Sequence, residues 1–183
     1  MRVACVVVPH FAVEVERLRD PSLRGRPVVV GGAPEERKAV VDCSAEALAR
    51  GVRPGMTLRE ALSRCAEAAF VEARPERYQA TTLAMVTGLL ELSPLVEPAE
   101  PGVIYVGIDS NFPVPKKQRR AAAPEADAME ARLAETIAAV VEAASGLEIR
   151  VGVADGKFAA YVAAVLGEAA LAGQALHAGG SEA

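Results

Sequence analysis

Short runs of β-branched residues constrain the fold of this chain most, because they are too short for helices and recur between helical patterns. Val3–Val8, Pro27–Val30 and Val40–Cys43 predict three strands, and Val103–Ile108 and Ile149–Ala154 predict two more. The helical segments between them do not alternate strictly with the strands. This mixture favours an α+β fold over a doubly wound parallel sheet.

The predicted helices have recognisable ends. Ser44 is a predicted N-cap, and Thr57 with Glu60 fits a capping box, in which a hydroxyl and a carboxylate satisfy the first backbone amides of a helix. The longest predicted helix is Glu125–Ser145, with apolar residues at helical spacing and Gly146 at its end. The other predicted helices are Phe11–Arg19, a segment from Pro75 to Ser93, and Phe158–Leu171.

Composition excludes several classes of protein. The 183 residues suffice for one medium domain or two small ones, and 51% of them are hydrophobic, as in a packed protein. The net charge of −4 gives no general attraction to nucleic acid. Three cysteines do not make a disulfide framework, and no apolar run reaches the roughly 20 residues that span a bilayer. A cytoplasmic protein is expected.

Five blocks of sequence resemble the Y-family (translesion, UmuC-like) DNA polymerases. They are Val6–Glu16, Asp20–Gly32, Gly51–Met56, Ser93–Pro98 and Gly146–Ala160, in the family's order. The resemblance covers roughly residues 3 to 164. It implies a palm with a mixed or antiparallel sheet and helices on one face, and a small inserted fingers subdomain.

The resemblance also implies the domain limits. Residues 1–10 and 77–165 would form the palm, 11–76 the fingers, and 166–183 the end of the C-terminal helix and a disordered tail. The thumb and little finger of the family would be absent.

The family's metal-binding carboxylates have no counterpart at the matching positions. Val7 and Pro9 stand where the family has two acidic residues, separated by one residue, on its first strand. Gly102 and Val103 stand where the family has its second acidic pair. Mg²⁺ requires oxygen ligands, which these side chains lack. We therefore expect no metal site, no cofactor and no catalysis.

The positions that hold the incoming nucleotide in the family are changed as well. Ala45 and Leu48 stand where a Tyr and an Arg contact the triphosphate, and Ala12 stands where an aromatic ring screens the sugar. Without the guanidinium, charge-assisted recognition of phosphate is lost there.

Candidate contacts to phosphate remain elsewhere. Lys157 lies where a helix begins and could meet a phosphate, or it could be a solvated lysine beside a turn. The 110–124 segment, read as a polar loop, could touch a DNA backbone through Lys116, Lys117, Arg119 and Arg120, or could be a charged surface loop.

Other reactive side chains have ordinary structural interpretations. His10 is expected to be a satisfied or partly exposed histidine and Cys43 a small buried residue at a strand end. Glu14 and Glu16 are expected to face solvent on a helix. The acidic residues that could rebuild a metal site are Glu14, Glu16, Asp42, Glu97, Glu100 and Asp109.

Because these carboxylates are missing, the chain resembles one type within the family, the ImuB type. These are the inactive polymerase-like proteins of bacterial mutagenesis cassettes. This implies a non-catalytic adaptor in DNA repair and translesion synthesis, with weak DNA binding. Its implied partners are an error-prone replicative-type polymerase and a RecA-like accessory protein, with sliding-clamp binding not expected through this part and no membrane. The alternatives are an active metal-dependent nucleotidyltransferase with relocated carboxylates, or a domain for protein interaction alone.

Overall fold

The computed structural model describes residues 2–108, 112 and 123–166, with the backbone alone for 123–130. These residues divide into two compact units: one holds the described residues of 1–8 and 84–183, and the other holds 9–83. The boundary falls inside helix α4 (Pro75–Leu90), between Leu83 and Ala84.

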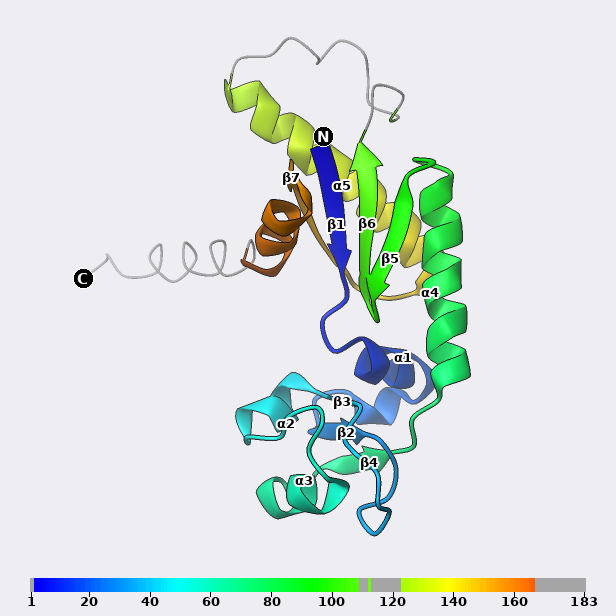
Figure 1. Ribbon diagram of the computed structural model, residues 1–183, viewed down its shortest axis with the longest axis vertical. Helices are drawn as coiled ribbons and strands as arrows, with labels where there is room; N and C mark the ends of the chain where they lie inside the picture. Colours follow the sequence, from blue (N-terminus) through cyan, green and yellow to red (C-terminus); the bar gives the residue numbers. More distant parts are fainter. Residues whose placement is uncertain (1, 109–111, 113–122, 167–183) are drawn as a thin grey trace, which may run out of the picture. The chain divides into compact units, whose positions relative to one another are not determined.

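The first unit is built on a four-stranded antiparallel sheet of order β5-β6-β1-β7 (Figure 1). Its strands are β1 (Arg2–Val7), β5 (Val96–Glu100), β6 (Val103–Ile108) and β7 (Arg150–Asp155). β1 pairs with both β6 and β7, so that this first predicted strand lies inside the sheet and is buried along most of its length.

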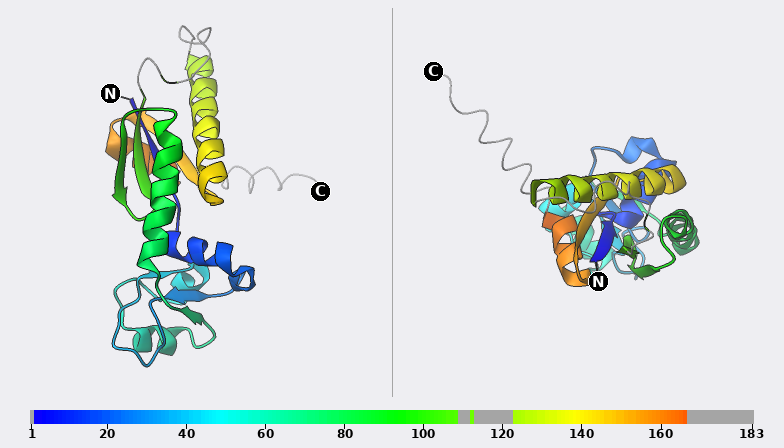
Figure 2. Two further views of the ribbon diagram at one scale, coloured as in Figure 1. Left: turned by 90° about the vertical axis from the view of Figure 1, so that its right-hand side faces the viewer. Right: turned by 90° about the horizontal axis from the view of Figure 1, so that it is seen from above.

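Helices cover both faces of this sheet. Helix α5 (Ala123–Ser145) lies on one face, as the two views of Figure 2 show, with α4 beside it. Gly88 of α4 allows the close approach, because a Cβ there would lie 3.1 Å from Val140 Cγ1 of α5. On the other face, a helix over residues 157–166 packs Ala160 and Ala164 against Val3, Cys5 and Val7 of β1.

The second unit surrounds a three-stranded sheet of order β3-β2-β4. The strands are β2 (Val28–Val30), β3 (Asp42–Cys43) and β4 (Ala69–Val71). β2 pairs antiparallel with β3 and parallel with β4.

Successive side chains of β2 point to opposite faces of the sheet, and helices pack against both faces. Val28 and Val30 pack with Ala12 and Val13 of helix α1 (Phe11–Arg19), whereas Val29 packs with the helices of the opposite side. Those helices are α2 (Ala45–Ala49) and α3 (Leu58–Arg64), and a short 3₁₀ turn, η1 (Pro21–Leu23), follows α1.

The predicted α+β class is confirmed, and so are the predicted helix caps. Ser44 accepts the N–H of Ala47, and Thr57 with Glu60 forms the full capping box of α3. Two strands were not predicted, β4 and β5. β5 is an exposed edge strand that contains Pro98, a residue tolerated in sheets mainly at edges.

No helix in the part of the chain that the structure describes is both long enough and apolar enough to cross a membrane. The predicted tail and the cationic segment of residues 116–120 lie outside the described residues.

Candidate functional site

The first candidate site is one end of the four-stranded sheet, where Val7, Gly102 and Val103 come together. Val7 of β1 lies opposite Val103 of β6 and opposite Arg150 of β7. The N–H of Val8 donates to the carbonyl of Gly102 over 2.8 Å. The antiparallel register therefore places three of the predicted positions side by side, and Pro9 follows directly in the chain.

These positions do not fit divalent metals. Val7 is 7% exposed and packs with Cys5 and Ala160, and neither a valine, a proline nor a glycine side chain offers an oxygen ligand. Among the described residues, no group of three or more His, Cys, Asp or Glu side chains could hold a metal ion. These positions therefore cannot supply the ligands for a metal-dependent reaction step.

Two carboxylates lie on the same face of the sheet, further along the edge strand. Glu97 pairs with Tyr105, and Glu100 pairs with Val103 after a register shift between Pro98 and Glu100. In a regular strand residues 97 and 100 would point to opposite faces, but a bulge redirects the second one. Glu100 is close enough to contribute to the raised pKa of Tyr105, which is due first to burial of the phenol.

Lys157 is bound to one of these carboxylates. Its Nζ lies 2.6 Å from Glu97 Oε2 and 5.4 Å from the centroid of the Tyr105 ring. Both partners of the ion pair are about half exposed, at 47% for Lys157 and 62% for Glu97. An exposed pair of this kind contributes little free energy, so that Lys157 can exchange Glu97 for another anion.

A cavity of about 320 Å³ lies beside this ion pair. Tyr105, Glu97 and Lys157 form its polar side, and Val3, Pro94, Leu95, Val96 and Gly107 line the rest.

In the second unit, the positions expected to contact the nucleotide carry no donor groups. Ala45 is exposed in the first turn of α2, Leu48 is half-buried against the core, and Ala12 is 6% exposed inside the α1 core. Arg53, five residues after Leu48, donates to the carbonyls of Leu48 and Val52 and so closes the end of α2.

Asp42 is a structural carboxylate that the sequence did not reveal. Its Oδ2 accepts the N–H groups of Ala12 at 3.0 Å and Val13 at 3.3 Å, so that it serves as the side-chain acceptor for the start of α1. Burial raises the pKa of Asp42, against the lowering effect of the backbone donors and of His10. His10 Nδ1 lies 4.0 Å from Asp42 Oδ1. The backbone of His10 is left-handed, with a φ of 53°, and turns the chain into α1.

Cys43 is buried, as predicted. Burial raises the pKa of its thiol to about 11, and the neighbouring charge of Asp42 adds to that shift. A thiol with this pKa is protonated at neutral pH, and the thiolate needed for nucleophilic attack is scarce.

The expectation that Glu16 faces solvent is wrong. The side chain is 0% exposed and accepts bonds from Arg19, Arg74 and Tyr78. Two of these partners lie more than 55 positions away in the chain, so helical spacing gave no sign of them. Glu14, by contrast, is partly exposed and pairs with Arg17.

The remaining candidates lie outside the described residues. These are Asp109, Lys116, Lys117, Arg119 and Arg120.

Known proteins resemble this chain over most of its length. The impB/mucB/samB family matches residues 6–165. DNA polymerase IV 2 of Mycobacterium tuberculosis is 36% identical over 168 residues, which are 90% of this chain and 44% of that protein. DNA polymerase IV of Exiguobacterium sibiricum is 33% identical over 153 residues, which are 84% of this chain and 39% of that protein.

Solved structures agree in fold. DinB from Sulfolobus solfataricus matches with a TM-score of 0.72 and 24% identity, over 90% of this chain and 45% of that one. An insertion ternary complex of Dbh DNA polymerase matches with a TM-score of 0.70 at the same identity and coverage. The chain thus spans less than half the length of the relatives it matches.

These relatives correct one expectation. From Val7, Pro9, Gly102 and Val103 we expected a protein that is not an enzyme, but relatives 31–36% identical are named DNA polymerase IV. The prediction of inactivity is contradicted, and the narrower assignment to the ImuB type gains no support. The match over residues 6–165, together with the antiparallel sheet and its inserted second unit, places this chain in the impB/mucB/samB family of Y-family DNA polymerases.

Proposed function

We propose that this chain supplies the palm and fingers of a DNA polymerase that acts in translesion synthesis. The unit with the four-stranded sheet would be the palm, and residues 9–83 the fingers. The observation that carries the proposal is the 36% identity with DNA polymerase IV 2 of Mycobacterium tuberculosis, which extends over 90% of the chain.

In this proposal the reaction is template-dependent nucleotidyl transfer, and its carboxylates lie away from the family's usual positions. Carboxylates are needed because the reaction in this family depends on divalent cations, which prefer hard oxygen ligands. Among the described residues, Glu97 and Glu100 share the sheet face of Val7 and Val103. Asp109 is a third candidate in the sequence.

Primer extension tests the proposal. The chain is incubated with a primed DNA template, the four nucleotides and Mg²⁺ or Mn²⁺, and incorporation opposite each template base is measured. Asp109→Asn, Glu97→Gln and Glu100→Gln are compared with Glu91→Gln, an exposed carboxylate at the end of α4. We expect the wild-type chain to incorporate nucleotides as the template directs, and incorporation to fall at least tenfold in one of the first three variants. Equal loss or equal retention in all four variants would overturn the proposal that the metal-binding carboxylates are relocated.

DNA binding is the second part of the proposal, and its protein partners would be proteins of mutagenesis cassettes. Fluorescence anisotropy with the same primed template measures the binding directly. A fall in affinity with rising salt is expected, because contacts to phosphates release counterions.

A further inference from the structure

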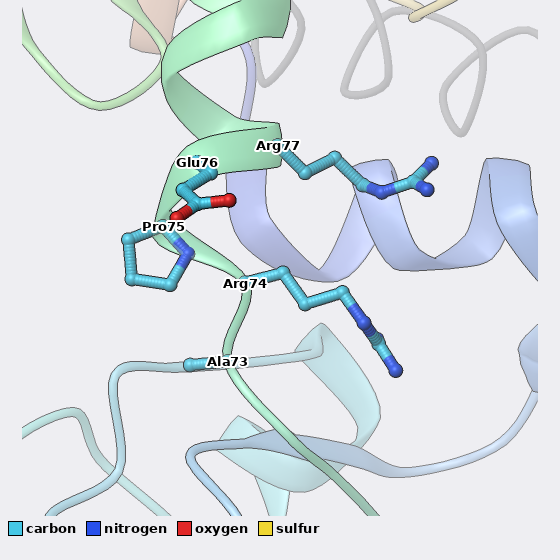
Figure 3. A pocket seen from close by; sticks show the side chains of 5 residues that line it. All are labelled: Ala73, Arg74, Pro75, Glu76 and Arg77. Atoms are coloured by element: carbon cyan, nitrogen blue, oxygen red, sulfur yellow. The ribbon is translucent and has the colours of Figure 1, made fainter.

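A cavity of about 520 Å³ opens at the first turn of α4, within residues 9–83. Ala73, Arg74, Pro75, Glu76 and Arg77 line it. Figure 3 shows Arg74 and Arg77 extending to the same side of the chain, with Pro75 and Glu76 on the other side. Two guanidinium groups therefore lie at one side of a single cavity.

Arg74 is held in place by the buried carboxylate of Glu16. Its Nη1 lies 2.6 Å from Glu16 Oε2, and its side chain remains 35% exposed. The same carboxylate accepts from Arg19 Nε at 3.2 Å and from the Tyr78 hydroxyl at 3.2 Å. A guanidinium has five N–H donors, so Arg74 keeps donors for a ligand while Glu16 fixes its orientation.

Arg77 adds a second guanidinium in the first turn of α4, three residues after Arg74. It is exposed, and no ion pair or side-chain hydrogen bond joins it to another residue of the described ranges. Arg74 directly precedes α4, and Figure 3 shows its side chain on the same side as that of Arg77.

The local charge favours an anion. Glu16 pairs with Arg19 and Arg74, and Glu76 is the one carboxylate that lines the cavity beside Arg74 and Arg77. The three arginines outnumber the two carboxylates, and the start of the 16-residue helix α4 adds a partial positive charge. Residues 9–83 hold 12 of the 20 Lys and Arg residues but only 11 of the 24 Asp and Glu residues. This unit is therefore the basic part of an acidic chain.

We propose that Arg74 and Arg77 together bind a phosphodiester group of a nucleic-acid backbone in this cavity. Planar guanidinium groups match phosphate geometry through paired N–H donors. The contact would position the nucleic acid without reading its sequence. The choice of nucleic acid as the source of the phosphate rests on the proposed function.

The test compares Arg77→Gln with Arg59→Gln, since Arg59 is an exposed arginine of α3 that does not line the cavity. Both variants lose one charge from the same unit. Anisotropy with primed DNA is measured over a range of salt concentrations. Loss of one phosphate contact lowers the slope of log affinity against log salt by about 0.9 for a duplex or about 0.7 for a single strand.

The same relation gives a loss of affinity of about fivefold at about 0.15 M salt for Arg77→Gln. Arg59→Gln should leave the slope unchanged. Equal slopes for the two variants would overturn the inference. Arg74→Lys serves as the second variant, because a lysine can still pair with Glu16 and keeps the charge while it loses the paired donors, so its affinity should fall while its slope stays unchanged.

A titration with pyrophosphate separates this inference from the proposed function. NMR signals of the arginine Nε–H groups should shift for Arg74 and Arg77 before Arg59. If DNA binds while neither the variants nor these signals respond, the inference fails and the proposed function stands. If the wild-type chain does not bind DNA but pyrophosphate shifts both signals, the site takes a free phosphate, and the nucleic-acid assignment and the proposed function both fail.

Discussion

At the scale of single residues, burial changes what the acidic side chains do. Glu16 and Asp42 each carry a charge into the interior of residues 9–83, and each is surrounded by donors. A buried charge is tolerated only when it is paired and hydrogen-bonded. Glu16 therefore stabilises the fold through its ion pairs, whereas Asp42 orients the start of α1 at a cost in desolvation that appears as its raised pKa.

Replacing Glu16 should destabilise residues 9–83. Glu16→Ala removes one carboxylate from Arg19, Arg74 and Tyr78, and removing one partner of a buried pair costs about 3 kcal/mol, reduced here to about 2 kcal/mol because both arginines are partly exposed. Urea denaturation measures the change. Glu14→Gln should cost less than about 1 kcal/mol, because Glu14 is 36% exposed and Arg17 keeps Glu46 as a partner. Equal losses in the two variants would contradict the assigned role of Glu16.

The stability of the protein should depend on Asp42 in a defined pH range. Burial raises its pKa in the folded state above the ordinary value of 3.8, so the folded chain keeps the proton at a pH where the unfolded chain has lost it. Its contribution to stability is therefore largest below the unfolded pKa and falls as pH rises through the folded one.

Asp42→Asn removes this dependence while its amide oxygen can still accept from Ala12 and Val13. The variant should gain stability relative to the wild type as pH rises above 3.8, as measured by urea denaturation at a series of pH values. A difference that stays constant, or one that moves the other way, would contradict the raised pKa.

The three cysteines should resist alkylation in the folded protein. All three are buried, and burial raises the pKa values of Cys5 and Cys43 to about 11. Iodoacetamide at neutral pH should modify none of them until urea unfolds the chain, as counted by mass spectrometry. Rapid labelling of Cys43 in the native protein would instead indicate a reactive thiol.

At the scale of elements, close approaches of the backbone decide how helices meet the first sheet. A Cβ on Gly152 of β7 would lie 2.2 Å from the nitrogen of Ala164 and 2.3 Å from the oxygen of Ala160. These are backbone atoms of the helix over residues 157–166, so they cannot move aside as a side chain can. Gly152 thus sets the distance between this helix, which carries Lys157, and the sheet, whose edge strand carries Glu97.

Gly152→Ala should displace this helix and destabilise the first unit by about 3 kcal/mol, the upper range for overpacking. Gly55→Ala is the matched control, since nothing lies within 4 Å of its Cβ and its φ of +86° costs only about 1 kcal/mol of backbone strain. Thermal and urea unfolding of both variants measures the difference. A Gly152→Ala loss no greater than that of Gly55→Ala would show that the helix adjusts freely.

At the scale of the whole molecule, the chain consists of two units with separate cores. Val29 and Leu58 belong to a core within residues 9–83, whereas Val3 and Ala160 belong to a core of the sheet unit. Substitutions without shared partners have nearly additive effects. Effects on one unit should therefore leave the other largely unchanged.

Hydrogen exchange measured by mass spectrometry tests this independence. Glu16→Ala should speed exchange in peptides from residues 9–83 and leave β1, β6 and β7 protected, while Gly152→Ala should do the reverse. Uniform acceleration across both units in either variant would mean that they unfold as one. The double variant should lose the sum of the two free energies within about 0.5 kcal/mol.

Local signals in the sequence determined many of the elements. β-branched runs predicted β1 and β6, helical spacing predicted α1 and α4, and the hydroxyl at Thr57 predicted the start of α3. Each of these features depends on residues within a few positions of one another. The blocks that resemble Y-family polymerases likewise led to the family, which the match over residues 6–165 confirms.

Only the tertiary structure decided which side chains meet across the chain. It buried Glu16 against Arg74, brought Lys157 to Glu97, and placed Asp42 at the start of α1. The partners in each pair lie 30 or more positions apart, and side-chain periodicity carries no information at that range. The edge strand β5 was missed for the same reason, because its exposed residues form a strand through pairing with β6 and not through a pattern of their own.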